Sequence, residues 1–288
     1  MDSAGLRPKR SLGQNFVVDP NTVRRIARLA HVGPNDNVIE IGAGLGSLTL
    51  ALVETGAHVV AVEVDDTLIP LLRENTSACD NVTVVHGDAM TLNWSQLLHD
   101  NSPTGDKTGD HIDWHVVANL PYNVATPLVA DILDSVPEIS HLLVMVQREV
   151  GERFAATPST PAYGAVSVKI AFWGAAKIEG IVPASVFLPR PNVESALVSI
   201  TRHAQPLATD IAPQQLFALV QAGFAKRRKM LRGALADRVT PEQYERASIA
   251  PTSRAEELDV HDWIRLTRVV SSSHPDNSTA LTAEASDL

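Results

Sequence analysis

The stretch VIEIGAGLGSLTLALVETG at residues 38–56 decides the fold class of this chain of 288 residues. Its pattern predicts a short apolar strand, a turn that contains Gly42, Gly44 and Gly46, and an apolar helix that ends at Gly56. Glycine lets a backbone turn sharply and approach a ligand closely, and the start of a helix offers free N–H groups. We therefore expect the first half of a βαβ unit, with a ligand bound at its turn.

Similar apolar runs alternate with helical patterns as far as about residue 150. Their residues are 58–64, 82–88, 115–120 and 141–147. Nearly continuous apolar runs are typical of parallel strands that are covered on both faces. Two later runs, 165–173 and 195–202, are expected to complete the sheet as an antiparallel pair. Before the first strand, Asp19 and Pro20 predict the N-cap and first residue of a helix.

The alternation of strands and helices stops after Arg202, and the remainder of the chain has mainly helical patterns. We predict a catalytic domain at residues 1–204, a helical domain at 205–270 and a disordered acidic tail at 271–288. The segment 100–113 is rich in Gly, Asp, Ser and Thr, which predicts a surface loop. The fold class is therefore α/β, with a small helical domain at the C-terminal end.

Composition excludes several classes of protein. Hydrophobic residues make up 44% of the chain and charged residues 20%, as in an ordinary globular protein. The single cysteine, Cys79, excludes a disulfide scaffold and a zinc site built from cysteines. No apolar run approaches the ~18 residues that span a bilayer, and the N-terminus lacks the apolar region of a secretory signal. We expect a cytoplasmic protein that contacts no membrane.

Basic residues are concentrated in two places, although the formal net charge is −9. Residues 1–30 carry six Lys or Arg and two Asp, a balance of +4. Residues 211–236 carry five Lys or Arg and no acid, a balance of +5. Two basic regions on an acidic protein favour local binding of phosphates, whereas a single cluster is more often a solvated helix face.

The glycine spacing indicates the class of cofactor. A dinucleotide site of the G-x-G-x-x-G type needs glycine at position 47, where this chain has Ser47. The G-x-G-x-G spacing of this chain is common among enzymes that use S-adenosylmethionine. Glu63 ends the next strand, where a carboxylate can accept hydrogen bonds from both ribose hydroxyls. Asp88 ends the third strand and could accept from the cofactor's adenine amine or simply cap a helix.

The fourth strand ends in Asn119, Leu120, Pro121 and Tyr122, and proline forces the chain out of the sheet there. The amine of an adenine is a poor nucleophile because its lone pair is delocalised into the ring. The side-chain oxygen of Asn119 and the backbone oxygen of Leu120 could accept its two N–H bonds and favour a pyramidal nitrogen. Tyr122 offers a ring on which an extruded base could stack. The structural alternative is an asparagine that caps a turn beside a core tyrosine.

Nine motifs occur in the order found in the ribosomal RNA adenine dimethylase family, which this chain resembles over about residues 8–265. They are SLGQNFVVD (11–19), EIGAGLGSLT (40–49), EVD (63–65), GDAM (87–90), NLPYNVATP (119–127), QREVGERF (147–154), YGAVSV (163–168), VFLPRPNVESALV (186–198) and FAKRRKMLRGAL (224–235). The NLPY and GQNF motifs are far more specific than the glycine turn. The resemblance implies a Rossmann-like methyltransferase sheet.

The resemblance also implies a set of cofactor contacts for S-adenosylmethionine. Asn15 and Val17 would line and help to close the pocket. Gly42 would contact the methionine end, and Gly44 is a further cofactor-binding residue of the same turn. Glu63 would contact the ribose and Asp88 the adenine of the cofactor.

For the target base, the resemblance implies that Asn119 borders both base and cofactor, with Leu120 as the second acceptor. Tyr122 and Phe187 would stack on the two faces of the flipped adenine. The helical domain, with KRRK at 226–229, would dock on rRNA. No metal is expected, because the methylated amine is acidic enough to lose its proton without one.

The family dimethylates two adjacent adenosines near the 3′ end of 16S rRNA, within the assembling small ribosomal subunit. We therefore expect that activity from this chain, as a monomer. Two alternatives are a large-subunit rRNA methyltransferase of the macrolide-resistance type and a non-catalytic ribosome assembly factor. A nicotinamide-dependent reductase is disfavoured by Ser47.

Overall fold

The computed structural model describes residues 9, 13–102 and 112–272, which form two compact units. The first unit consists of the described residues of 1–155 together with 173–202, and the second of 156–172 together with the described residues from 203 onward. Residues 156–172, which the sequence analysis assigned to the catalytic domain, therefore belong to the second unit. The tail expected at 271–288 lies outside the described residues except for 271–272, which end a helix.

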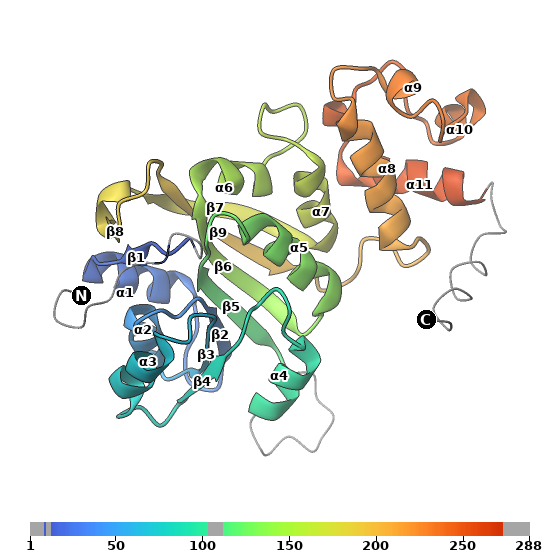
Figure 1. Cartoon of the computed structure of the whole chain (residues 1–288). Coiled ribbons are helices and arrows are strands. Elements are labelled where there is room, and N and C mark those ends of the chain that lie inside the picture. Colours follow the sequence, from blue (N-terminus) through green and yellow to red (C-terminus); the bar gives the residue numbers. More distant parts are fainter. Residues whose placement is uncertain (1–8, 10–12, 103–111, 273–288) are drawn as a thin grey trace, which may run out of the picture. The chain divides into compact units, whose positions relative to one another are not determined.

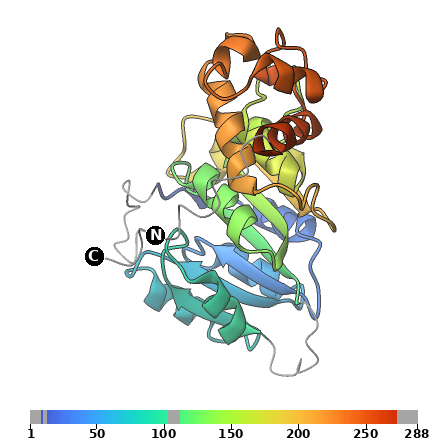
Figure 2. The ribbon, with the colours of Figure 1, turned by 90° about the vertical axis from the view of Figure 1, so that its right-hand side faces the viewer.

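The first unit is built on a seven-stranded sheet of order β4-β3-β2-β5-β6-β9-β7 (Figures 1 and 2). Its strands are β2 (Asn37–Ile41), β3 (His58–Glu63), β4 (Val82–His86), β5 (Trp114–Asn119), β6 (Ile139–Gln147), β7 (Gly174–Val182) and β9 (Ser195–Arg202). The strands from β4 to β6 pair in parallel, and β9 pairs antiparallel to both β6 and β7. The expected α/β sheet is confirmed, including all five strands predicted before residue 150.

Helices cover both faces of this sheet (Figure 1). They are α1 (Pro20–Leu29), α2 (Ser47–Val53), α3 (Ile69–Thr76), α4 (Trp94–Asn101), α5 (Ala125–Ser135) and α6 (Arg148–Phe154), with a 3₁₀ turn at Ala184–Val186. Asp19 caps α1 as expected, because its carboxylate accepts a hydrogen bond from Thr22 N at 2.8 Å. Val23 and Ile26 of α1 pack with Leu48 and Leu52 of α2 into one core cluster against the strands.

One predicted strand is wrong: residues 165–173 form a helix, α7 (Ala165–Trp173). The run is apolar except for Ser167 and Lys169, and a mainly apolar run of nine residues fits a buried helix as well as a buried strand. Its neighbour β7 has the sequence GAAKIEGIV, whose charges and glycines concealed it. An edge strand tolerates these residues because one of its sides pairs with no other strand. The antiparallel partner of β9 at this edge is therefore β7.

The second unit contains α7 without its last residue and four further helices, α8 (Pro213–Ala225), α9 (Leu231–Ala234), α10 (Pro241–Arg246) and α11 (Val260–Ser272), with a 3₁₀ turn at Ala255–Glu257. Its core is aromatic: the ring of Phe224 packs at 6.0 Å from Tyr163 and 6.2 Å from Trp263. Tyr163 is buried, and its hydroxyl donates to Leu258 O at 2.9 Å. The helical character expected after Arg202 is confirmed.

Two short strands form a separate ribbon in the first unit. They are β1 (Phe16–Val17) and β8 (Phe187–Leu188), which pair antiparallel, with Phe16 opposite Leu188 and Val17 opposite Phe187. Val18 N extends the pairing by donating to Val186 O at 2.8 Å. The ribbon joins the N-terminal segment to the loop that precedes β9.

Candidate active site

The sheet has a switch point at β2. From this strand the chain proceeds through β3 and β4 on one side, whereas β5 and β6 lie on the other. Open α/β sheets bind ligands outside the carboxyl ends of the strands at such a point, where the connections diverge. The glycine turn follows β2, and Asn119 ends β5. The fold thus brings the two motifs that the sequence analysis singled out to adjacent strand ends.

The glycine turn requires glycine at three positions, because Gly42, Gly44 and Gly46 have φ values of +76°, +59° and +89°. A Cβ on Gly44 would lie 2.9 Å from Cε1 of Phe16, which is closer than such atoms approach. A Cβ on Gly42 would lie 3.6 Å from Asn119 O. The missing side chains therefore leave a cradle between the turn, the N-terminal segment and the end of β5.

Glu63 lies beside this cradle at the end of β3 and is 4% exposed. One carboxylate oxygen accepts from Gly44 N at 2.7 Å, and the other accepts from Asp65 N at 2.8 Å. These two backbone donors hold the carboxylate at the edge of the cradle. Each oxygen retains a further lone pair that can accept a ribose hydroxyl.

The N-terminal arm, which we define as Lys9 and Gly13–Val18, lies across the cradle. Phe16 packs against Gly44, and Gln14 and Asn15 line the same cavity as Glu63. Asn119 holds the arm from the opposite side, since its Nδ2 donates to Asn15 O at 2.9 Å.

This hydrogen bond also orients the Asn119 amide. With Nδ2 committed to Asn15 O, the side-chain oxygen Oδ1 is the atom left to accept from a ligand. Among the described residues, none donates a hydrogen bond to Asn119 Oδ1 or to Leu120 O. The next residue in the chain, Pro121, accepts from Val124 N at 3.1 Å, so the loop turns away directly after the two acceptors. The site therefore presents two adjacent oxygens with free lone pairs.

Tyr122 follows in the same loop and is half-buried. Its hydroxyl makes a hydrogen bond of 2.9 Å with Oγ of Ser195, the first residue of β9. Burial raises the pKa of the Tyr122 hydroxyl above its usual value, so it stays protonated. The bond fixes the ring at the rim of the cavity.

These residues share a cavity of about 70 Å³. It is lined by most of the predicted site residues, namely Asn15, Gly42, Gly44, Glu63, Asn119, Leu120 and Tyr122. Five of its lining residues were missed by the sequence analysis: Gly13, Gln14, Phe16, Val64 and Pro121. Each lies within two residues of a predicted residue, in one of the motifs GQNF, EVD and NLPY, so these motifs were the available signal.

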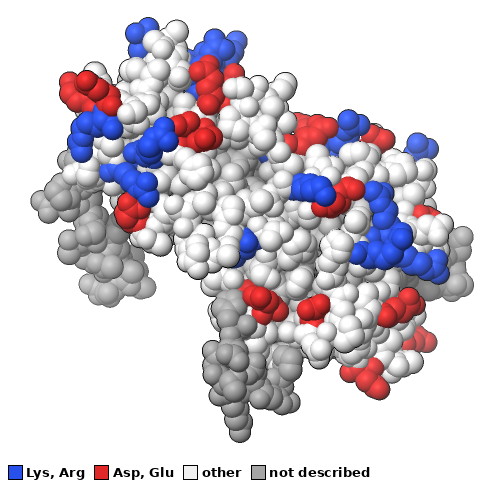
Figure 3. All heavy atoms as spheres, turned by 180° about the vertical axis from the view of Figure 1, so that it is seen from behind, with Lys and Arg blue, Asp and Glu red and all other residues white. Residues whose placement is uncertain are grey.

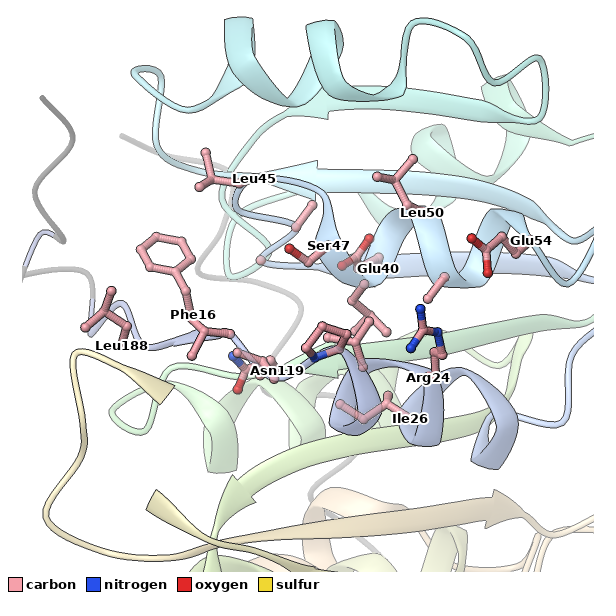
Figure 4. Close-up of a pocket in the computed structure, with 18 residues that line it drawn as sticks. Phe16, Arg24, Ile26, Glu40, Leu45, Ser47, Leu50, Glu54, Asn119 and Leu188 are labelled. Carbon is pink, nitrogen blue, oxygen red and sulfur yellow. The ribbon is translucent and has the colours of Figure 1, made fainter. Parts of the chain in front are cut away.

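A second cavity of about 670 Å³ shares Phe16, Gly42 and Asn119 with the first and runs between α1 and α2 (Figure 4). Figure 4 shows Phe16 and Leu188 toward one end, Arg24 and Glu54 toward the other, and Glu40 between them. Glu40 is 1% exposed and accepts from Thr49 Oγ1 at 2.5 Å. Burial raises the pKa of Glu40 to about 8, so this carboxyl is largely protonated at neutral pH.

Three predicted site residues do not line the smaller cavity. Val17 lines the larger one. Asp88 is exposed just after β4, and its Oδ1 accepts from Met90 N at 2.9 Å within a turn. It caps no helix, because α4 begins at Trp94 and has Asn93 as its N-cap. Phe187 is 3% exposed and belongs to the core cluster with Val23. The ribbon brings the backbone of Phe187 beside the arm, but its ring packs in the core.

The basic KRRK cluster, Lys226 to Lys229, lies in the second unit and is exposed throughout. Although this unit is helical, the cluster is not part of a helix, because α8 ends at Ala225 and residues 226–229 form the turn that follows. Arg227 is partly engaged, with Nε 2.7 Å from a carboxylate oxygen of Glu256. Figure 3 shows that basic side chains on the face drawn there gather in separate groups, with acidic side chains between them.

The chemistry of the smaller cavity fits S-adenosylmethionine. The glycine cradle admits a close approach, and the buried Glu63 carboxylate suits a ribose diol. The cavity is smaller than the ~300–1,000 Å³ usual for ligand sites, but it shares Phe16, Gly42 and Asn119 with the larger cavity, which adds space beside it. Within the described residues, no three His, Cys, Asp or Glu side chains are placed to hold a metal ion. In that part of the chain no helix has both the length and the hydropathy to cross a membrane.

Proteins of known description are similar to this chain over most of its length. A "Ribosomal RNA small subunit methyltransferase A" from Streptomyces coelicolor is 43% identical over 272 residues, which is 91% of each chain. One of the same description from Cutibacterium acnes is 44% identical over 279 residues, covering 92% of this chain and 89% of the relative.

Solved structures show the same fold. A dimethyladenosine transferase from Plasmodium falciparum superposes with a TM-score of 0.73 at 20% identity, covering 87% of this chain and 95% of that one. The 23S rRNA methyltransferase ErmE superposes with a TM-score of 0.66 at 24% identity, covering 89% and 99%. A family model described as ribosomal RNA adenine dimethylase matches residues 5–271. Because that match extends over nearly the whole chain, the protein belongs to the ribosomal RNA adenine dimethylase family.

Proposed function

We propose that this protein dimethylates the exocyclic amines of two adjacent adenosines near the 3′ end of 16S rRNA, with S-adenosylmethionine as methyl donor. The observation that carries the proposal is the pair of acceptors, Asn119 Oδ1 and Leu120 O, which lie in one cavity with the glycine turn and Glu63. The relatives described as small-subunit rRNA methyltransferases support the choice of RNA.

The methyl donor would be held by the residues that form the cradle. Gly42 and Gly44 would lie against its methionine end, and Glu63 would accept from its ribose. Asn15 and Val17 would complete the pocket from the arm, and Asp88 would accept from the adenine amine if the turn at its Oδ1 rearranges. When bound, S-adenosylmethionine supplies an electrophilic methyl group on a positively charged sulfur.

The chain's own contribution is to make the target amine nucleophilic. Asn119 Oδ1 and Leu120 O accept the two N–H bonds, which draws the nitrogen out of conjugation with the ring and stabilises the positive charge that develops. The Asn15 O bond keeps the amide from rotating, so Oδ1 is preorganised for this role. No general base on the chain is needed, since the alkylated nitrogen is acidic and can release its proton to water.

The target base would stack on Tyr122, whose ring is fixed by the Ser195 hydrogen bond. Phe187 would cover the opposite face of the base. Its ring packs in the core without RNA, so this role requires the ring to rotate outward from the β1–β8 ribbon. Flipping a base into a pocket of this kind is typical of enzymes that modify one.

The second unit would position the small subunit through the exposed KRRK cluster, with phosphates as the partners. We expect the enzyme to act as a monomer in the cytoplasm, on an assembling subunit.

The test is to incubate the protein with methyl-labelled S-adenosylmethionine and small subunits that lack these methyl groups, then map the labelled nucleotides. Label on both adjacent adenosines of 16S rRNA is the expected result. Large subunits serve as the parallel substrate, because label in 23S rRNA would instead support the macrolide-resistance alternative. Absence of label from both, with intact binding to subunits, would support a non-catalytic assembly factor.

A further inference from the structure

The buried carboxylate of Asp65, which is not one of the proposed catalytic or cofactor-binding groups, binds two residues of the N-terminal arm. The side chain of Asp65 is 2% exposed. Its Oδ1 lies 2.7 Å from Lys9 Nζ, and its Oδ2 accepts from Gln14 Nε2 at 2.8 Å. Lys9 N in turn donates to Gln14 Oε1 at 2.8 Å, so the two arm residues are tied to each other as well as to Asp65.

Asp65 is held in place for this role by its own loop. Thr67 donates to Oδ1 through its backbone N at 3.0 Å and through its hydroxyl at 2.6 Å. Burial alone would raise the pKa of Asp65, but the hydrogen bonds from Lys9, Thr67 and Gln14 hold it well below its usual value. The carboxylate is therefore charged whenever the protein is folded at neutral pH.

The contact between Asp65 and the arm lies next to the cofactor cavity. Asp65 N donates to Glu63, and the residue between them, Val64, lines the cavity. On the arm side, Gln14 lines the cavity with its neighbour Asn15. The same short stretch of chain thus carries the ribose-binding carboxylate and the anchor of the segment that lies over it.

We propose that Asp65 is a positioning residue that fixes the N-terminal arm over the cofactor and thereby sets how long the cofactor stays bound. This inference rests on the proposed use of S-adenosylmethionine. The arm supplies Gln14, Asn15 and Phe16 to the lining of the cavity, so a cofactor bound there lies against the arm. A loosened arm contacts the ligand for a smaller fraction of the time, which weakens the apparent affinity by that fraction.

The test measures dissociation of S-adenosylmethionine by stopped-flow displacement, without RNA, in the full-length protein. Asp65→Asn keeps the size of the side chain but removes its charge. We expect its dissociation rate constant to rise by about tenfold and Kd by about threefold, since access is eased as well. The matched control is Asp66→Asn. Asp66 is 76% exposed and lies 3.7 Å from Lys9 Nζ, and its substitution should change either constant by less than about twofold.

A second variant separates loss of the ion pair from any effect of Asp65→Asn on folding. Lys9→Met alters a side chain that is 41% exposed, and it should reproduce most of the increase with an unchanged melting temperature. In the wild type, dissociation should accelerate with added salt, because the ion pair is partly solvated, and Lys9→Met should abolish that dependence. The cofactor should dissociate from the variant that combines Asp65→Asn with Lys9→Met no faster than from Asp65→Asn alone, because both substitutions remove the same interaction.

Dissociation rates within twofold of wild type in both variants would overturn the role of Asp65 but leave the proposed function intact. A wild-type protein that binds no S-adenosylmethionine would overturn both. Unchanged methyl transfer at saturating donor is expected for Asp65→Asn and separates this positioning role from a catalytic one.

Discussion

Replacing Asn119 by alanine tests the proposed reaction most directly, because the proposal gives its amide oxygen a catalytic role while its amide nitrogen holds the arm. The substitution removes Oδ1, the proposed acceptor for the target amine, and Nδ2, the donor to Asn15 O. Loss of an acceptor that acts in the transition state costs about 2.7–4 kcal/mol, or roughly 10²–10³ in rate. Loss of one neutral hydrogen bond to the arm costs about 1 kcal/mol, or roughly fivefold in donor affinity.

The assay compares single-turnover methyl transfer to undermethylated small subunits with calorimetric binding of S-adenosylmethionine. We expect Asn119→Ala to lower the rate constant at saturating donor by at least about 10², with Kd raised by less than about tenfold. Asn123→Ala, at an exposed asparagine of the same loop, is the matched control and should retain the wild-type rate. Wild-type transfer by Asn119→Ala, or a loss explained entirely by Kd, would refute the acceptor mechanism.

Three further predictions follow from other parts of the structure. Gly44→Ala should weaken donor binding by more than about tenfold in calorimetry, because φ is +59° and the new Cβ would meet Phe16 at 2.9 Å; unchanged binding would contradict the cradle. Neutralising the KRRK cluster should weaken binding to small subunits and flatten the dependence of log Kd on log salt, whereas an unchanged slope would make the cluster a solvated surface. Burial lowers the pKa values of His115 and His141 below 6.5, so the folded state resists their protonation. The free energy of unfolding should therefore fall as pH drops below 6.5, and in urea titrations His141→Gln should reduce that fall.

The catalytic fold was predictable because its signals are local. Each parallel strand is a short apolar run, and Asp19 and Pro20 mark the start of α1 within two residues. Helix α7 was predicted as a strand because the local signal is ambiguous there. Residues 165–173 are apolar except for Ser167 and Lys169, and β7, which follows them, carries charges. Periodicity cannot resolve such a run, since tertiary packing decides its conformation.

The site also has residues that the sequence predicted and residues that it did not. Gly42, Glu63 and Asn119 follow strands, so the topology of the sheet was enough to bring them together. Asp65 was not predicted, because its partners Lys9 and Gln14 are 56 and 51 residues away in the chain. The sequence also does not reveal how a side chain packs. Phe187 is an example, because its ring is buried in the core.

The pairing of β1 with β8 has a thermodynamic consequence. It connects a segment that borders the donor pocket with the residues that lead to the proposed base-stacking phenylalanine. If rRNA binding rearranges this ribbon, occupancy of either ligand site must alter the affinity of the other by the same factor. Cooperativity between the methyl donor and rRNA would then arise from two residue pairs, without any movement of the seven-stranded sheet.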